Sequence, residues 1–452
     1  MKKIISLIIV CMIIISGMFI YGKSDKKDLL EDNNLPIIAA VINGKASTTF
    51  PTTNKYTATV ECTKNGIKQD VGAKATWNGT KWVVSFNDIS AGNVRCNAIF
   101  KTPNFAETIL ANNEVKTPIT TPGAAISTAD EALLASAEDD YGTSYYFRGA
   151  VKNNYVEFAN KCWRIVRIVG DGSVKLILHN DNTTGAANPC DSANNSASAA
   201  FARYSGTTYN SAFNENTGDN GHVGFMYGDF ISSCNNHPEI ISEQDCYSAG
   251  YTWGTSSYIE AHANINKSTI LVNLETWYTN NLASYADKLA DTIWCNDKST
   301  VSAKPGYGTY STVYAAYNRV YSTGQPTLIC PIDNSGGKLS KFTVDDTING
   351  NGNLTYKVGL ITADELAYAG YAKRLKNTTT YLQENATSDY WWSLSPSNFS
   401  GHGALVWYGG SNNHLLTSES VGDSFGVRPS ISLKPSTNVT GDGTSEKPYV
   451  VN

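Results

Sequence analysis

The sequence has few charged residues and no basic stripe. Lys, Arg, Asp and Glu together make up 17% of the chain, below the roughly 25% of an ordinary domain. The 40 acidic and 35 basic residues leave a net charge of −5. Proteins that bind nucleic acid concentrate Lys and Arg on one face, so this composition argues against a nucleic-acid partner. Asn, Ser, Thr, Gly and Tyr are abundant instead.

Motifs for metals and catalysis are equally scarce. The chain has no CxxC pair, and its six histidines are scattered, so we expect no metal and no other cofactor. The segment 345–353 faintly resembles a calcium loop, but Tyr356 stands where an EF-hand needs Glu, and we interpret the segment as a turn. There is no His-Glu-x-x-His motif, and no catalytic residue is assigned.

Only the N-terminus carries a long apolar run. Met1-Lys2-Lys3 is followed by an uncharged stretch from Ile4 to Tyr21. A secretory signal has a hydrophobic region of roughly 7–15 residues, whereas a spanning helix needs about 20. We therefore expect a single-pass membrane anchor, with a cleaved signal peptide as the alternative. Either one places the rest of the chain outside the cytoplasm, at the cell surface or secreted.

Eight cysteines remain beyond this segment. An even number in an exported chain predicts disulfides, although eight cysteines permit on the order of a hundred pairings. They are Cys62, Cys96, Cys162, Cys190, Cys234, Cys246, Cys295 and Cys330.

Changes in composition divide the chain into five parts. Residues 1–23 form the predicted anchor or signal, and residues 24–34 a charged, polar spacer. A first domain follows over 35–114. The Pro-, Thr- and Gly-rich segment 115–130 has the composition of a linker. A larger domain then occupies 131–452.

The first domain contains segments in which inward and outward residues alternate, as in half-buried strands. Because Cys62 and Cys96 both fall on the inward side, we expect an inter-sheet disulfide between them, with Trp77 or Trp82 nearby. This arrangement predicts a small immunoglobulin-like β-sandwich that serves as a spacer. The inward positions are Tyr56, Ala58, Val60 and Cys62; Trp82, Val84 and Phe86; and Val94, Cys96, Ala98 and Phe100.

The second domain has the pattern of an α+β fold. Apolar segments between residues 145 and 178 predict a β-meander with a Gly-rich turn at 170–172. A loop-rich stretch follows. Ser268 then caps a predicted helix, and Thr362 begins a capping box in front of a second one. The predicted buried stripe of the first helix is Ile270, Leu274, Trp277 and Leu282.

The C-terminal region combines aromatic strands with loops of Asn, Ser, Gly, Tyr and His. The segment 390–396 has the pattern of an aromatic strand, and 406–408 that of a second strand. The residues between and after them have the composition of antibody binding loops. A plain hairpin with solvated loops is the alternative, and the residues alone do not choose between the two.

Eight motifs in order resemble an uncharacterised domain of surface proteins from low-GC Gram-positive bacteria, many of them gut commensals. The resemblance covers roughly residues 131–452. The motifs are Tyr-Tyr-Phe-Arg-Gly (145–149), Trp-Arg-Ile-Val-Arg-Ile (163–168), Val-Gly-Phe-Met-Tyr-Gly (223–228), Glu-Ala-His-Ala-Asn (260–264), Trp-Cys-Asn-Asp-Lys (294–298), Val-Gly-Leu-Ile-Thr-Ala-Asp-Glu (358–365), Tyr-Trp-Trp-Ser-Leu-Ser-Pro (390–396) and Gly-Val-Arg-Pro (426–429).

That domain in turn is similar to the C-type-lectin-like fold of formylglycine-generating enzymes and of diversity-generating-retroelement variable proteins. The resemblance implies a large domain with two helices and long disulfide-stapled loops, in which Trp391, Trp392, Val427 and Arg428 are scaffold. The chain lacks the C-terminal cysteines of the formylglycine-generating enzymes and the calcium-binding motif of lectins. The implied binding face is Trp407, Tyr408, Ser411, Asn412, Asn413, His414 and Ser418.

These expectations combine into a surface protein that captures a glycan or protein on another cell and is attached to its own membrane by the N-terminal helix. Two alternatives stay open: a structural component of a surface fibre, and an extracytoplasmic enzyme acting on wall or glycan substrates. For the disulfides of the large domain, we expect Cys295–Cys330 and Cys234–Cys246, which leaves Cys162 with Cys190.

Overall fold

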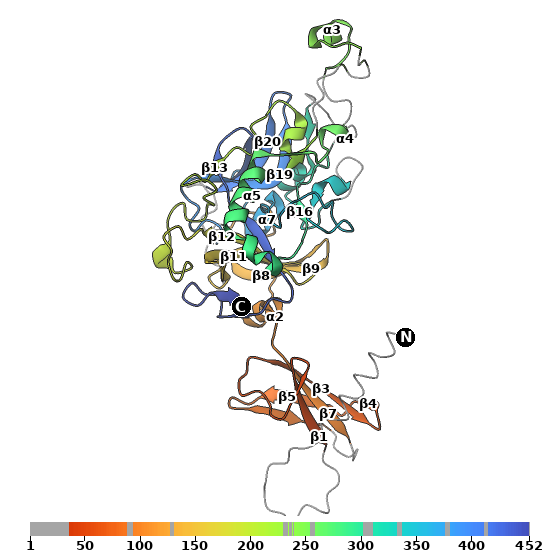
Figure 1. The fold of residues 1–452 in the computed structure, drawn as a ribbon, viewed down its shortest axis with the longest axis vertical. Helices are drawn as coiled ribbons and strands as arrows, with labels where there is room; N and C mark the ends of the chain where they lie inside the picture. The colour runs from red at the N-terminus through yellow and green to blue at the C-terminus, as the bar shows by residue number, and fades with distance from the viewer. Residues whose placement is uncertain are drawn as a thin grey trace, which may run out of the picture. The chain divides into compact units, whose positions relative to one another are not determined.

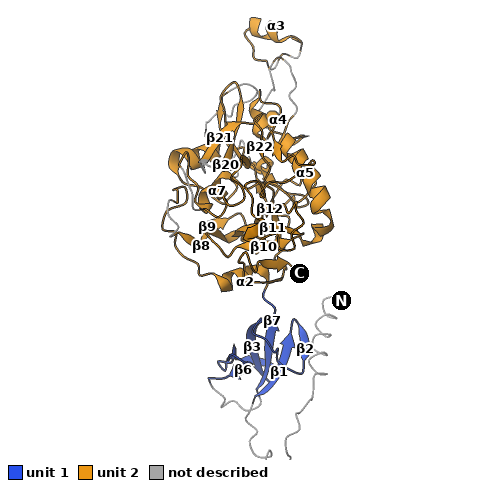
Figure 2. Cartoon of the chain, turned by 90° about the vertical axis from the view of Figure 1, so that its left-hand side faces the viewer, with its two compact units in different colours: residues 1–103 blue, residues 104–452 orange. Residues whose placement is uncertain are grey.

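The chain divides into two compact units, Met1–Pro103 and Asn104–Asn452 (Figure 2). The computed structural model describes residues 36–87, 94–126, 131–228, 234, 237, 239–253, 258–301, 311–331, 337–375, 380–410 and 415–451. The predicted anchor and spacer, residues 1–34, lie outside this set. Within it, no helix is long and apolar enough to cross a membrane.

The described residues of unit 1 form a five-stranded sheet and a separate hairpin. The sheet has the order β2-β1-β7-β3-β4, and β5 pairs with β6. Trp82 of β6 packs against Phe100 of β7 with 5.2 Å between ring centroids, so the hairpin covers one face of the sheet. The strands are β1 (Ile37–Ile42), β2 (Lys45–Ser47), β3 (Thr57–Lys64), β4 (Ile67–Gln69), β5 (Lys74–Trp77), β6 (Trp82–Ser85) and β7 (Arg95–Lys101).

The Cys62–Cys96 disulfide forms as expected, but within one sheet. Cys62 lies directly opposite Cys96 on the antiparallel pair β3 and β7, and both side chains are buried. The prediction of an inter-sheet bridge was therefore wrong. Alternation correctly placed both cysteines on the buried face, but it cannot tell whether two strands belong to the same sheet or to facing sheets.

Replacing both Cys62 and Cys96 with alanine is expected to lower the free energy of unfolding of unit 1 by about 2–4 kcal/mol, because the crosslink restricts the unfolded chain. Scanning calorimetry of the full chain would show the unit 1 transition at lower temperature. A matched Cys234→Ala/Cys246→Ala control removes a bridge in unit 2 and should leave the unit 1 transition in place. An unmoved unit 1 transition in the first variant would contradict the prediction.

The boundary between the units lies earlier than expected. Residues 104–114 were assigned to the first domain, but α2 (Phe105–Asn112) belongs to unit 2. Phe105 packs on Tyr449 near the C-terminus, with 5.2 Å between ring centroids. The sequence does contain a local signal for this helix, because Asn104 and Glu107 form a capping box.

The expected linker, residues 115–130, is packed onto unit 2 over its described part, residues 115–126. The amide of Lys116 donates to the carbonyl of Leu134 at 2.8 Å. Arg148, fully buried, donates to the carbonyls of Thr121 and Ala124. The composition of this segment predicted an unstructured linker, whereas these hydrogen bonds hold its backbone in place on unit 2.

Unit 2 contains two main sheets (Figure 1). The eight-stranded sheet comprises β8 (Ala132–Asp139), β9 (Gly142–Gly149), β10 (Tyr155–Phe158), β11 (Lys161–Ile168), β12 (Val174–Asn180), β23 (Ser430–Leu433), β24 (Val439–Thr440) and β25 (Tyr449–Val451). The six-stranded sheet comprises β13 (Asn210–Ser211), β17 (Thr312–Val313), β19 (Tyr390–Phe399), β20 (Ala404–Gly410), β21 (Leu415–Ser420) and β22 (Phe425–Gly426). Two short pairs are added: β14 (Met226–Tyr227) with β15 (Asn266–Lys267), and β16 (Trp294–Cys295) with β18 (Lys341–Phe342).

The helices of unit 2 are short apart from α5. Besides α2, those in its described part are α3 (Glu243–Ser248), α4 (Tyr258–Ala261), α5 (Thr269–Asn281), α6 (Ala315–Tyr317) and α7 (Ala363–Ala369), with 3-10 turns η1 (Ser192–Asn194), η2 (Asn220–Val223), η3 (Ala283–Lys288) and η5 (Gly337–Ser340) and the π-helical turn η4 (Asn318–Thr323). Mostly strands with few helices, the chain has the mixed α+β class that we expected.

Both helices predicted from the sequence are present. Ser268 caps α5, and the Thr362–Glu365 capping box opens α7. All four residues of the predicted α5 stripe are buried. Trp277 of α5 packs on Trp163 of β11 with 6.1 Å between ring centroids, so α5 covers a face of the eight-stranded sheet.

The remaining disulfides pair as expected: Cys162–Cys190, Cys234–Cys246 and Cys295–Cys330. Four disulfides indicate that the chain folds in an oxidising environment outside the cytoplasm, and they are compatible with secretion.

Candidate functional site

The aromatic part of the predicted binding face is buried. Trp407 is 1% and Tyr408 7% exposed, so neither can lie on an exposed face. Ser418 is half-buried on β21, and residues 411–414, which include Ser411, Asn412, Asn413 and His414, lie outside the described set.

The reason is that β20 is covered on both faces. Trp407 points toward Tyr317 of α6, with 6.2 Å between ring centroids. On the other face, Tyr408 packs on Tyr390 and Phe425, each at 4.8 Å. The segment therefore resembles a core strand more than a binding loop. The four residues expected to be scaffold, Trp391, Trp392, Val427 and Arg428, are buried as predicted.

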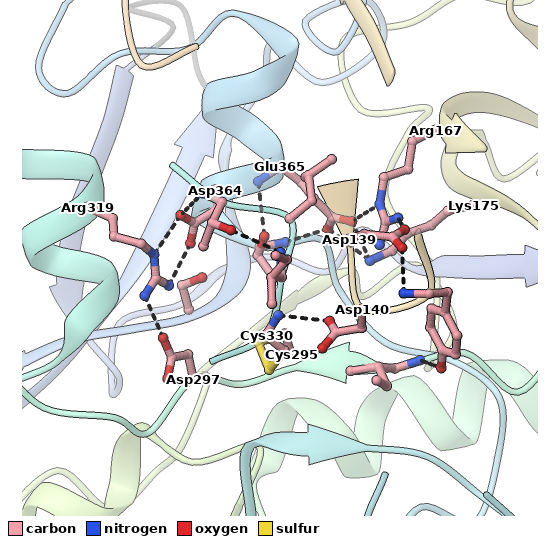
Figure 3. A pocket seen from close by; sticks show the side chains of 17 residues that line it. Asp139, Asp140, Arg167, Lys175, Cys295, Asp297, Arg319, Cys330, Asp364 and Glu365 are labelled. Atoms are coloured by element: carbon pink, nitrogen blue, oxygen red, sulfur yellow. Dashed lines mark hydrogen bonds and ion pairs between the residues drawn. A yellow bond between two sulfur atoms is a disulfide. The ribbon is translucent and has the colours of Figure 1, made fainter. Parts of the chain in front are cut away.

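A cleft rich in charged groups opens elsewhere in unit 2 (Figure 3). Its enclosed cavity is about 20 Å³, room for about one water molecule, and the rest of the hollow is open to solvent, so only the mouth can take a larger ligand. Five carboxylates line it together with Arg167, Lys175 and Arg319. The full lining is Asp139, Asp140, Tyr141, Arg167, Lys175, Ile293, Cys295, Asp297, Arg319, Thr327, Leu328, Ile329, Cys330, Thr362, Asp364, Glu365 and Ser395.

On one side of the cleft, Glu365 joins α7 to the eight-stranded sheet. Its carboxylate accepts from Arg167 of β11 at 2.9 Å and from Lys175 of β12 at 2.7 and 2.9 Å. Although burial opposes it, the attraction of Lys175 and Arg167 lowers the pKa of Glu365 to about 2. Burial in turn lowers the pKa of Lys175 to about 8. Arg167 also pairs with Asp139.

On the other side, Arg319 of η4 holds two carboxylates. It donates to both oxygens of Asp364 at 2.9 and 3.0 Å, and to Asp297 at 2.8 Å. The amide of Thr327 donates to Asp364 at 3.0 Å. Because Asp364 and Glu365 are neighbours in the first turn of α7, one capped helix positions both sides of the cleft. Burial raises the pKa of Asp297.

The wall between these sides is fixed by the Cys295–Cys330 disulfide. The amide of Cys330 donates to Asp140 at 2.8 Å, and Asp140 also pairs with Lys341. The hydroxyl of Tyr141 accepts from the amide of Ile293 at 3.2 Å, and burial raises its pKa.

Three of these groups retain access to solvent. The Arg319 side chain is 15% exposed, Asp140 is partly exposed, and Tyr141 is half-buried. Five carboxylates against Arg167, Lys175, Arg319 and the adjacent Lys341 leave the cleft with one net negative charge. The cleft therefore presents oxygen acceptors and N–H donors in fixed positions.

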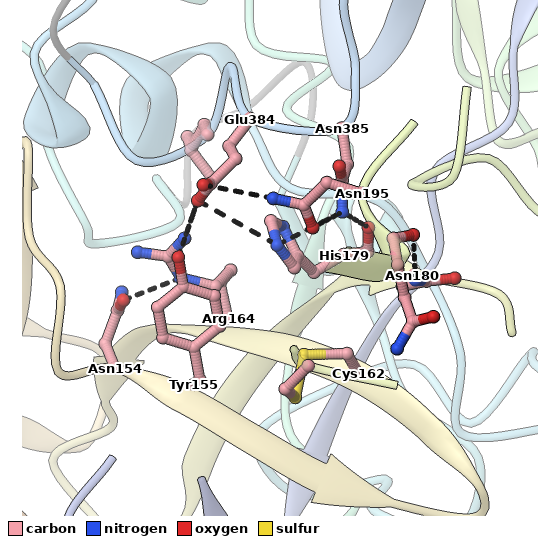
Figure 4. Close-up of polar contacts among 12 residues, drawn as sticks. Asn154, Tyr155, Cys162, Arg164, His179, Asn180, Asn195, Glu384 and Asn385 are labelled. Atoms are coloured by element: carbon pink, nitrogen blue, oxygen red, sulfur yellow. Dashed lines mark hydrogen bonds and ion pairs between the residues drawn. A yellow bond between two sulfur atoms is a disulfide. The ribbon is translucent and has the colours of Figure 1, made fainter. Parts of the chain in front are cut away.

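A second polar cluster lies around Glu384 (Figure 4). Tyr155 and Arg164 both donate to Glu384 Oε2, at 2.6 and 2.8 Å, and the guanidinium of Arg164 stacks on the Tyr155 ring at 3.7 Å. His179 is fully buried beside them, and burial lowers its pKa well below the usual value, so it is neutral. These contacts tie β10, β11 and β12 to the segment before β19, which is a structural role.

The residues whose sequence pattern could indicate a catalytic nucleophile or a metal site do not line the cleft. The sequence contains one Gly-x-Ser-x-Gly match, at 422–426, but Ser424 is exposed in a turn between two strands and not at a strand-to-helix elbow. Asp346 accepts from the amides of Ile348 and Asn349, as expected for a turn. No group of three His, Cys, Asp or Glu side chains in the described ranges could hold a metal ion.

The cleft cannot be seen in the sequence because its charged residues come from strands, turns and helices that are far apart in the chain. The one usable signal was the capping box, which named Glu365 as a helix-start residue but not as an ion-pair partner. Only the tertiary structure shows which of the few charged side chains are buried together.

Comparisons of the chain with protein-family models, with curated proteins and with solved structures found no match.

Proposed function

We propose that this chain is an extracytoplasmic ligand-binding protein that captures a neutral or amine-bearing glycan at the mouth of the charged cleft. Among the described residues, the candidate site is this cleft and not the aromatic face that the sequence suggested. We also propose surface display, an immunoglobulin-like spacer for unit 1 and a C-type-lectin-like fold for unit 2. The four disulfides support an extracellular location. For unit 1 the support is the hairpin packed on the sheet through Trp82 and Phe100, since the bridge lies within one sheet. For unit 2 it is the combination of two sheets with few helices and disulfide-closed segments.

The observation that carries the proposal is the fixed set of donors and acceptors at the mouth of the cleft. Arg319 is held by Asp364 and Asp297, and Asp140 is held by Lys341 and the Cys330 amide. Side chains already fixed lose little conformational entropy when a ligand binds. A sugar, which offers several hydroxyl groups in one plane, matches such a mixed surface, and the net negative charge disfavours an acidic ligand.

Ion pairing favours binding over catalysis at this site. Each of the five carboxylates in the cleft forms an ion pair with Arg167, Lys175, Arg319 or Lys341. Glu365, with a pKa of about 2, stays ionised and cannot act as a general acid at neutral pH. Because every carboxylate of the cleft is already paired with a cation, the arrangement supports a binding protein better than a hydrolase that relies on two carboxyl groups.

Substitution at the cleft mouth tests the proposal. Tyr141→Phe and Asp140→Asn remove a hydroxyl and a charge with little change of shape, and each is expected to weaken glycan binding about tenfold, the loss of one hydrogen bond to a charged or fixed group. Binding of the purified, oxidised chain would be measured on a glycan array and then by calorimetry.

Two controls accompany this test. Glu419→Gln changes an exposed carboxylate on β21 and should leave binding unchanged. A triple variant, Asn412→Ala, Asn413→Ala and His414→Ala, probes the face suggested by sequence. Binding that is lost in the triple variant and retained in both cleft variants would overturn the cleft as the site, and no binding to any glycan would overturn the function.

A further inference from the structure

A tight turn at residues 372–375 presents two cations on the surface of unit 2. The amide of Leu375 donates to the carbonyl of Ala372 at 3.3 Å, which closes the turn. The amide of Arg374 donates to Leu416 of β21 at 3.0 Å, which fixes the turn against the edge of the six-stranded sheet. Arg374 has a φ of 53°, a left-handed conformation that is uncommon for a residue with a long side chain. Strained positions of this kind occur frequently at functional sites.

The two cations of this turn are not neutralised by the parts of the chain described here. Arg374 is exposed and Lys373 half-buried, and neither forms an ion pair with a described carboxylate. Desolvation and the adjacent charge of Arg374 lower the pKa of Lys373. Two adjacent unpaired cations stand out in a chain with a net charge of −5.

Aromatic side chains hold Lys373 in place. Its ammonium contacts the ring of Tyr321, and Tyr317 stacks on Tyr321 with 4.6 Å between ring centroids. Tyr317 in turn contacts the buried Trp407. Tyr321 remains 38% exposed and Leu375 56% exposed. The cations are therefore presented from a surface anchored in the core, with a partly exposed phenol and an apolar side chain beside them.

We propose that Tyr321, Lys373, Arg374 and Leu375 form a binding site for acidic polysaccharide, separate from the cleft. Arg374 and Lys373 would meet carboxylate, sulfate or phosphate groups of the polymer, since guanidinium pairs with such oxyanions through two parallel hydrogen bonds. The phenol edge of Tyr321 and the side chain of Leu375 would contact a sugar ring.

The size of the patch favours a polymer over a folded partner. A stable protein interface takes roughly 20–30 residues a side, whereas four residues form this patch. A linear polymer with a charge on each repeat can gain affinity from repeated contacts at several copies of so small a site. The cleft carries the opposite net charge, so the two sites would select different ligands.

The test measures binding of the purified, oxidised full chain to immobilised polygalacturonate, dextran sulfate and a poly(glycerol phosphate), with neutral dextran as the blank. The three acidic polymers distinguish carboxylate, sulfate and phosphodiester. Binding to at least one is expected, and it should weaken as salt rises because exposed charges are screened.

The decisive variant is Lys373→Gln with Arg374→Gly. Glycine adopts the left-handed conformation of position 374 without strain, so this variant removes both charges and keeps the turn. We expect it to lose about tenfold or more in affinity, as for two exposed charge-assisted contacts, with an unchanged melting temperature. Glycan binding in the cleft should persist in it, which separates failure of this site from failure of the proposed function.

The matched control, Lys74→Gln with Lys81→Gln, removes two exposed positive charges from unit 1. Undiminished affinity in the Lys373/Arg374 variant would overturn the site. An equal loss of affinity in the control would also overturn the site, because it would indicate binding through overall charge. The absence of binding to all three acidic polymers would overturn it as well.

Discussion

Glu365→Gln is expected to destabilise unit 2 by about 3–5 kcal/mol, the cost of breaking a buried ion pair and leaving the partner charge buried. Glu365 is buried and bonds to Lys175, Arg167 and the amide of Thr362. In the variant, Arg167 would keep its ion pair with Asp139, whereas Lys175 would lose the only described carboxylate that it pairs with. Denaturant unfolding followed by tryptophan fluorescence measures the change.

The pH dependence of this effect has a defined sign. The folded-state pKa of Glu365 is about 2, below the ordinary value of 4.5. A carboxyl group with a depressed folded-state pKa contributes stability that is present above its unfolded pKa and is lost as pH falls. The difference between wild type and Glu365→Gln should therefore be largest above pH 4.5 and shrink toward pH 2.

The matched control for this experiment is Glu419→Gln, which makes the same chemical change on an exposed residue of β21. Its effect should stay within about 0.5 kcal/mol, as is usual for surface substitutions. Equal stabilities of the two variants would show that the Glu365 ion pairs do not contribute as the geometry indicates.

Trp407→Ala is expected to destabilise unit 2 by about 3–5 kcal/mol, the usual cost of truncating a buried aromatic residue. Trp407 lies in the core between β19, β21 and Tyr317. Were it instead on an exposed binding face, the same change would cost little stability and would reduce ligand binding. Thermal and denaturant unfolding measured beside ligand binding distinguishes these two outcomes.

Two further variants make the result specific. Trp407→Phe retains most of the apolar volume and should cost clearly less than the alanine variant. Ser418→Ala, on the half-buried neighbouring strand opposite Trp407, should be near neutral. A Trp407→Ala variant as stable as wild type would contradict the burial of this side chain.

Local sequence patterns were sufficient to predict individual helix caps and strand faces of this protein. Ser268 and Thr362 were identified as helix caps because capping depends on residues within one turn. The same logic would have identified α2 from Asn104 and Glu107. The alternation around Cys62 and Cys96 correctly gave their shared buried face, because strand periodicity is also local.

Local patterns failed where a neighbour distant in sequence decides exposure. Tyr408 and Trp407 have the composition of a binding loop, but Phe425 and Tyr317 cover them. Residues 115–126 have the composition of a linker, but Arg148 bonds to their carbonyls. The composition of a segment indicates how well its residues suit exposure to solvent, but it does not indicate which distant residues pack against that segment.

The sequence by itself determined the α+β class, the presence of disulfides formed in an oxidising environment, and the caps of α5 and α7, because these depend on composition and short spacing. Only the tertiary structure decided that the Cys62–Cys96 bridge lies within one sheet, that Trp407 is core, and that Arg319 and Glu365 meet in one cleft. The physical reason is that burial and ion pairing are properties of contacts between distant segments, and the same residue types satisfy many alternative contacts until the backbone selects one.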